Sequence, residues 1–247
     1  LKAGWNDLVL PFDQAASNGL NKTKINFFRL YNIAADPNLM YTMKVSDVKI
    51  IRMEDTLKMP SHYTGNMLFQ QNKPIVLTGT AGAGHTIDAA IYNGSDQIAS
   101  ASATAAADKS WSVSLPAMKG GYTKYTIKIR DNGEEAKTLE NVVIGEQWLA
   151  SGQSNMEYYL ERDPEGHDMI VNGPHDEYIR AFLMPFSPDG NLPSGNVPYE
   201  PKDSVKSGHW VTGEDGASLG QMSAIAYHFA VKLRQELDVP VGILNTD

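Results

Sequence analysis

The chain has 247 residues, which exceeds one average domain, and its formal net charge at pH 7 is −8. An acidic chain gains nothing from phosphate backbones, so nucleic acid is excluded as the expected partner. No apolar run is long enough to cross a bilayer, and with no cysteine there are neither disulfides nor thiolate metal sites. We therefore expect two or three domains without a membrane span, and the avoidance of free thiols is typical of an exported protein.

Residues 1–57 have the pattern of a β domain. Apolar runs occur at residues 5–12, 25–31 and 41–51, and apolar and polar side chains alternate in the last of them. The runs resemble the closing strands of a jelly-roll sandwich of the carbohydrate-binding type, a fold that needs about eight strands. We expect these residues to be the C-terminal part of such a domain.

Two aromatic side chains in this segment are candidates for sugar binding. Trp5 and Tyr31 would stack on a sugar ring if they faced outward, and the alternative is that both are buried core residues. The chain starts at Leu1 without a methionine or a signal segment, so we expect it to be an internal piece of a longer polypeptide.

Residues 66–141 form a second predicted β module, which follows a short linker at residues 57–65. Asn-Gly pairs at residues 93–94 and 132–133 are typical of hairpin turns. Six or seven short strands at this spacing predict a small immunoglobulin-like β-sandwich. The expected strands are at residues 67–69, 75–79, 86–92, 97–103, 111–115 and 125–129.

Residues 142–247 change to alternating strands and helices, with a βαβ crossover between residues 179 and 244. Residues 187–207 are rich in Pro, Gly, Ser and Asn, and such a long irregular segment is typical of a functional or mobile loop. The expected elements are a buried strand at 142–150, a short helix or turn at 156–165 that stops near Pro164, a strand at 178–185, a helix at 223–237 and a strand at 239–244. The helix has apolar side chains at four-residue intervals, namely Ile225, Phe229, Leu233 and Leu237.

Ser154 follows the predicted strand at residues 142–150. Ligands of open α/β sheets bind beyond the carboxyl ends of the strands. A serine that opens a helix there also has free backbone N–H groups beside it, which can receive the charge of an attacked carbonyl oxygen. The alternative is that Ser154 only caps a helix, with Glu157 completing a capping box.

Residues 145–149 (Gly-Glu-Gln-Trp-Leu) and 152–156 (Gly-Gln-Ser-Asn-Met) resemble the nucleophile block of the SGNH hydrolases. The resemblance is to the branch that contains sialate O-acetylesterases and related carbohydrate acetylesterases. Residues 66–75 and 222–245 are similar to the same family, so the resemblance extends over about residues 66–247. It implies that residues 142–247 are the first half of a flavodoxin-like hydrolase domain.

Ester hydrolysis by a serine suggests roles for individual residues. Ser154 would be the nucleophile and would donate one oxyanion hydrogen bond from its own backbone N–H. Gln153 and Asn155 would orient the turn or the substrate, although turn chemistry alone also favours such residues. Glu157 is more typical of a helix cap than of a catalytic acid. Arg180, at the start of a strand, would pair with a carboxylate such as that of a sialic acid, or form a surface ion pair.

The general base is absent from this pattern. In the family, a second oxyanion donor is a glycine just after the strand that corresponds to residues 239–244, a third is a later asparagine, and the base lies in an Asp-x-x-His. This chain has no Asp-x-x-His, so the catalytic His and Asp are expected outside it, in the remainder of the same polypeptide. Four histidines in this chain are candidates to replace the missing base: His209, which we rank first, and His167, His175 and His228. The alternative for each is that it is only a solvated surface residue.

No pair of histidines or carboxylates has convincing ligand spacing, so no metal or other cofactor is predicted. The Gly-rich residues 79–84 join β runs and do not open a helix, which argues against a phosphate loop.

We predict an exported bacterial carbohydrate O-acetylesterase, similar to the sialate O-acetylesterases, that works through an acetyl-enzyme. Its partner would be an O-acetylated sugar or polysaccharide, either an acetylated sialic acid or a plant polymer such as xylan. The chain alone is expected to be inactive. The alternative is a non-catalytic glycan-binding or scaffolding module with an inert hydrolase remnant.

Overall fold

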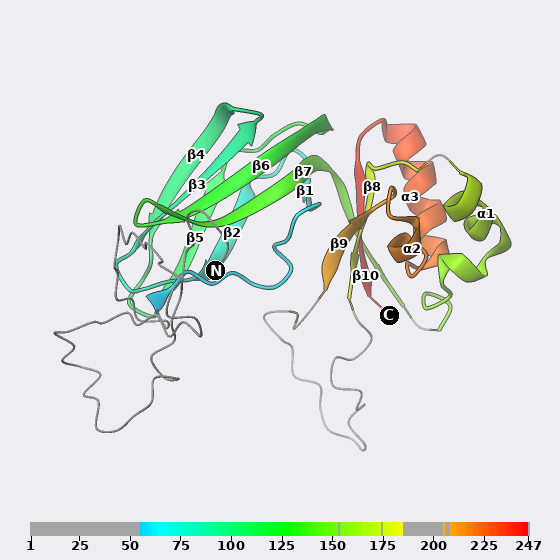
Figure 1. Cartoon of the computed structure of the whole chain (residues 1–247), viewed down its shortest axis with the longest axis horizontal. Coiled ribbons are helices and arrows are strands. Elements are labelled where there is room, and N and C mark those ends of the chain that lie inside the picture. The colour runs from blue at the N-terminus through cyan, green and yellow to red at the C-terminus, as the bar shows by residue number, and fades with distance from the viewer. Residues whose placement is uncertain (1–54, 153, 174, 185–204, 206–207, 247) are drawn as a thin grey trace, which may run out of the picture. The chain divides into compact units, whose positions relative to one another are not determined.

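The computed structural model describes residues 55–246, apart from residues 153, 174, 185–204 and 206–207 (Figure 1). All of the elements below belong to one compact unit, Ile50–Asp247. The predicted jelly-roll remnant, with Trp5 and Tyr31, lies outside the described residues, as does most of the irregular segment at 187–207.

The first part of this unit is rich in antiparallel strands. Strands β4, β3, β6 and β7 lie side by side in that order, β1 pairs with β7, and β2 and β5 form a separate two-stranded sheet. Buried and exposed residues alternate along β3 and β5, so one face of each strand faces a shared apolar core. The strands are β1 (Leu68–Gln70), β2 (Ile75–Thr80), β3 (Thr86–Asn93), β4 (Asp96–Thr104), β5 (Ser110–Leu115), β6 (Gly121–Asp131) and β7 (Glu134–Ser151). All six predicted runs correspond to strands.

One of the two predicted hairpin turns is at the predicted residues, and the other is shifted. Asn132 and Gly133 both have positive φ, at 51° and 86°, which is the conformation that an Asn-Gly hairpin turn requires, and they join β6 to β7 as predicted. Between β3 and β4, Asn93 pairs with Asp96. The turn is therefore formed one residue later than predicted.

Strand β7 is shared by two sheets. Its first half pairs antiparallel with β6, and residues 146–151 pair parallel with β10 (Val241–Thr246). The prediction of a strand at 142–150 missed residues 134–141, half of which are charged and most of which are exposed, so they lack the apolar pattern of a buried strand. The predicted domain boundary at 141/142 falls inside β7, at Asn141, whose φ is 54°.

The parallel strands occur in the order β7, β10, β8 (Ile179–Leu183), and β9 (His209–Thr212) pairs antiparallel with β8. In a flavodoxin-like sheet the first strand lies between the second and the third. Here the third strand, β10, lies between the other two, so the predicted flavodoxin-like order is not observed. Strand β9, which begins at His209, was not predicted.

The segment after β7 differs from its prediction. Residues 154–157 form a turn, a 3₁₀ turn η3 spans Leu160–Arg162, and helix α1 begins at Pro164 and ends at Asn172. The predicted helix or turn at 156–165 is thus a turn that ends before Pro164, but the helix that begins at Pro164 was not predicted. Proline is favourable there because its missing N–H costs nothing at a first helical position. Asp163 caps this helix by accepting a hydrogen bond from Gly166 N at 2.8 Å.

Helices α1, α2 (Gly216–Leu219) and α3 (Ala224–Leu237) lie on the same side of β8 and β10 (Figure 1). Helix α3 has the predicted extent, with Ser223 as its N-cap. Its buried face consists of small side chains and one tyrosine, whereas three of the regularly spaced apolar residues are exposed. The exposed fractions are 54% for Ile225, 42% for Phe229 and 46% for Leu237.

Candidate functional site

The candidate nucleophile lies in the turn that follows β7. Ser154 is exposed and comes three residues after Ser151, the last residue of the strand. Ser151 is in register with Thr246 at the end of β10. Ser154 is therefore close in sequence to the carboxyl end of a parallel strand, which is the edge where open α/β sheets bind ligands.

Close packing keeps this turn tight. A Cβ atom at Gly152 would lie 2.5 Å from Cγ of Met156, so only glycine fits without displacing that side chain. Met156 Sδ in turn lies 4.0 Å from Oγ of Ser223, the N-cap of α3. The residues on either side of Ser154 are thus held against each other and against the start of α3.

Backbone hydrogen bonds anchor the chain just beyond the turn. Ala224 N donates to Tyr158 O at 2.8 Å, and Leu160 N donates to Met222 O at 2.8 Å. Ser223 N donates to the side-chain Oδ1 of Asn245 at 3.1 Å, and Asn245 is only 5% exposed. The sequence analysis missed this role of Asn245, although an amide inside an otherwise apolar strand is a signal of a buried polar contact.

The backbone N–H groups of the turn are available to a ligand. Between residues that the structure describes, no hydrogen bond uses the N–H of Ser154 or Asn155. No helix begins at Ser154, so the expectation that it opens or caps a helix, with Glu157 in a capping box, was wrong. Gln153 lies outside the described residues.

None of the candidate histidines forms a hydrogen bond with Ser154 among the described residues. His228 Nε2 lies 3.0 Å from Asp163 Oδ2, and His175 Nε2 lies 3.0 Å from Ile170 O. His167 and His209 are exposed. The hydrogen bond from His228, followed by that from Gly166 N, lowers the pKa of Asp163 below its ordinary value of 3.8.

Arg180 has neither of the roles considered from the sequence. Its side chain is fully buried, at 0% exposure. The guanidinium donates to Met67 O at 3.2 Å, to Asn141 O, and to Asn141 Oδ1 at 3.1 Å. Burial lowers its pKa from 12.5 to about 10, so it stays charged at neutral pH. Arg180 therefore supports the β7 bend, the irregularity at Asn141 where φ is 54° and the register with β6 shifts, and it is not accessible to a sugar carboxylate.

The fold resembles that of a known carbohydrate acetylesterase. The enzyme is from Xanthomonas citri, and its crystal structure matches 77% of this chain with a TM-score of 0.66 and 26% sequence identity. The chain spans 40% of the length of that acetylesterase. No family model matches the sequence, and no curated protein matches it.

A second solved structure, the BSP domain of a biofilm-associated protein, matches 36% of the chain at 21% identity with a TM-score of 0.22, which is too low to indicate a shared fold.

Within the described ranges, no three His, Asp or Glu side chains are grouped so that they could hold a metal ion. No helix in that same part of the chain has the length and apolar character needed to span a membrane.

Proposed function

We propose that the chain contributes the nucleophile to a serine esterase that removes acetyl groups from carbohydrates. The observation that carries this proposal is Ser154 itself, exposed in a tight turn beyond β7 with free backbone N–H groups beside it. The structural similarity to a carbohydrate acetylesterase supports an esterase with a sugar substrate. The resemblance of residues 145–156 to the SGNH nucleophile block supports the serine mechanism.

In the proposed reaction, Ser154 Oγ attacks the carbonyl carbon of the acetyl ester. The oxyanion of the tetrahedral intermediate receives a hydrogen bond from the N–H of Ser154. A general base takes the hydroxyl proton and delivers it to the sugar oxygen as the ester bond breaks, which leaves an acetyl-enzyme. Water then attacks this intermediate and releases acetate.

The base is proposed to come from another part of the same polypeptide. Among the described residues, no candidate histidine forms a hydrogen bond with Ser154, and His228 is engaged with Asp163. In this proposal residues 66–141 form an immunoglobulin-like support, and residues 142–247 are the first half of an SGNH hydrolase domain in an exported protein. The SGNH assignment depends on the nucleophile block, since the observed strand order is not the flavodoxin-like one.

The test compares Ser154→Ala with Ser151→Ala. Ser151 is the matched control because it is also exposed and is the last residue of β7. In the longer polypeptide, hydrolysis of p-nitrophenyl acetate should fall by about 10³-fold or more in Ser154→Ala and stay within about 3-fold in Ser151→Ala. The chain of 247 residues alone should show no Ser154-dependent turnover. Equal rates for the parent and Ser154→Ala would refute the esterase.

A further inference from the structure

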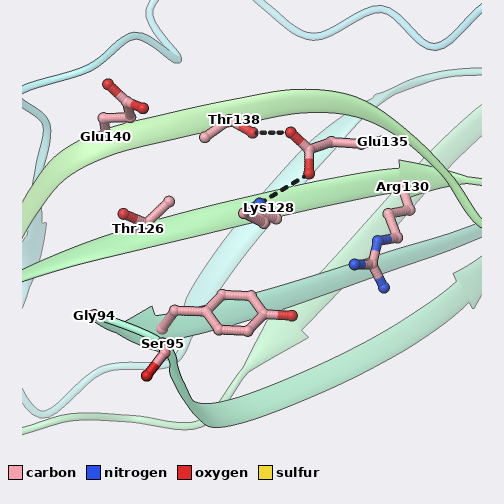
Figure 2. A pocket seen from close by; sticks show the side chains of 9 residues that line it. Gly94, Ser95, Thr126, Lys128, Arg130, Glu135, Thr138 and Glu140 are labelled. Carbon is pink, nitrogen blue, oxygen red and sulfur yellow. Dashed lines mark hydrogen bonds and ion pairs between the residues drawn. The ribbon is translucent and has the colours of Figure 1, made fainter.

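A polar hollow lies on the outer face of the antiparallel sheet, away from the apolar core (Figure 2). It has a volume of about 530 Å³, which is within the usual range for small-molecule sites, about 300–1,000 Å³. Ile127 and Ile129 of β6 are fully buried, so Lys128 and Arg130 between and beyond them point to the opposite face. The hollow is therefore separate from the turn that holds Ser154.

Strand register explains why this face is hollow. Tyr92 of β3 is opposite Thr126 of β6, and Lys128 of β6 is opposite Thr138 of β7. The two threonines are short, whereas Tyr92 and Arg130 are long. The short threonine side chains therefore leave room beside the long side chains of Tyr92, Lys128 and Arg130.

The centre of the hollow is held rigid by its own contacts. Lys128 Nζ lies 3.0 Å from Glu135 Oε2, and Thr138 Oγ1 donates to Glu135 Oε1 at 2.8 Å (Figure 2). These hydrogen bonds, that from Lys128 first, lower the pKa of Glu135. Arg130 and Glu140 lie on either side of this pair, and within the described part of the chain neither side chain has a hydrogen bond or ion pair. A free guanidinium and a free carboxylate can each form two parallel hydrogen bonds with a ligand.

The composition of the hollow selects the class of ligand. Its charged side chains are two cations, Lys128 and Arg130, and two anions, Glu135 and Glu140, so the lining carries no net charge that would favour a charged ligand. The remaining lining is polar except for the ring of Tyr92, which offers one apolar surface. A sugar ring combines hydroxyl groups at its rim with an apolar C–H face, and it meets both requirements.

We propose that this hollow is an accessory binding site for a neutral saccharide chain, with Tyr92 stacking on a sugar ring and Arg130 and Glu140 bonding its hydroxyls. The site does not depend on Ser154 and goes beyond the proposed esterase. It would hold a glycan on the sheet while another part of the same protein acts on it.

Isothermal titration calorimetry of the purified chain against neutral xylo-, manno- and cello-oligosaccharides tests this proposal. At least one of them should bind saturably, and Tyr92→Ala and Arg130→Ala should each weaken binding by about 10-fold. Tyr92→Phe keeps the ring and should retain most of the affinity. Lys137→Ala, an exposed change on β7 outside the hollow, should have no effect.

Thermal unfolding of each variant separates lost binding from lost folding. The proposal is overturned if no neutral oligosaccharide binds, if both Tyr92→Ala and Arg130→Ala bind normally, or if oligogalacturonate binds more tightly than the neutral sugars. Hydrolysis of p-nitrophenyl acetate by the longer polypeptide should be unchanged in Tyr92→Ala. A failure of this site is therefore distinguishable from a failure of the esterase.

Discussion

Replacing the buried Arg180 by methionine should destabilise the protein. The guanidinium donates to Met67 O, Glu177 O, Asn141 O and Asn141 Oδ1. Met67 O would keep its hydrogen bond from Val143 N, whereas the other acceptors would lose the donor that Arg180 supplies. An unsatisfied buried acceptor costs about 1–3 kcal/mol. Removing the desolvated charge offsets part of this loss, so we expect Arg180→Met to lower the free energy of unfolding by about 2–4 kcal/mol.

Urea denaturation followed by tryptophan fluorescence and far-UV circular dichroism measures this change. Arg130→Met is the matched control, because Arg130 is exposed and should change stability by no more than about 0.5 kcal/mol. Arg180→Lys keeps the charge but not the planar fork, so it should lie between the parent and Arg180→Met. A methionine variant as stable as the parent would refute the assignment of Arg180 as the support of the β7 bend.

Two further predictions concern the surroundings of the Ser154 turn. Asn245→Leu removes the acceptor of Ser223 N, and it should lower the free energy of unfolding by about 1–2 kcal/mol in urea denaturation; an unchanged midpoint would contradict this role. Asp163 has a lowered pKa in the folded state, so its contribution to stability is present above pH 3.8 and is lost as the pH falls through the folded-state pKa. The difference in melting temperature between the parent and Asp163→Asn should therefore shrink in acid, and a constant difference would show that the His228 contact does not stabilise the carboxylate.

The strands were predictable where one face is buried, because burial then leaves an alternating pattern in the sequence. Residues 111–115 alternate strictly, and they form β5 as predicted. The first half of β7 carries charged side chains on an exposed surface, so it had no such pattern. In α3 the apolar spacing predicted the helix but not its buried face, because the small side chains of Ala226 and Ala230 are buried whereas Phe229 is 42% exposed.

For the candidate site, the position of Ser154 after a strand followed from the local sequence. The role of Arg180 did not, because its acceptors belong to Met67 and Asn141, which are distant in the chain. Asn245 was missed for the same reason, since its partner, Ser223, lies on another element. Contacts between elements depend on the tertiary arrangement, and a local pattern does not encode them.

The shared strand β7 limits how this protein can be divided for expression. A truncation at residue 141 or 142 would cut a continuous strand next to the carbonyl that Arg180 binds, and it would leave the buried guanidinium without that acceptor. Neither fragment would keep all of the strand-to-strand hydrogen bonds that β7 forms. We therefore expect the antiparallel strands and the serine turn to be obtained as soluble material only together, and to melt as a single cooperative unit.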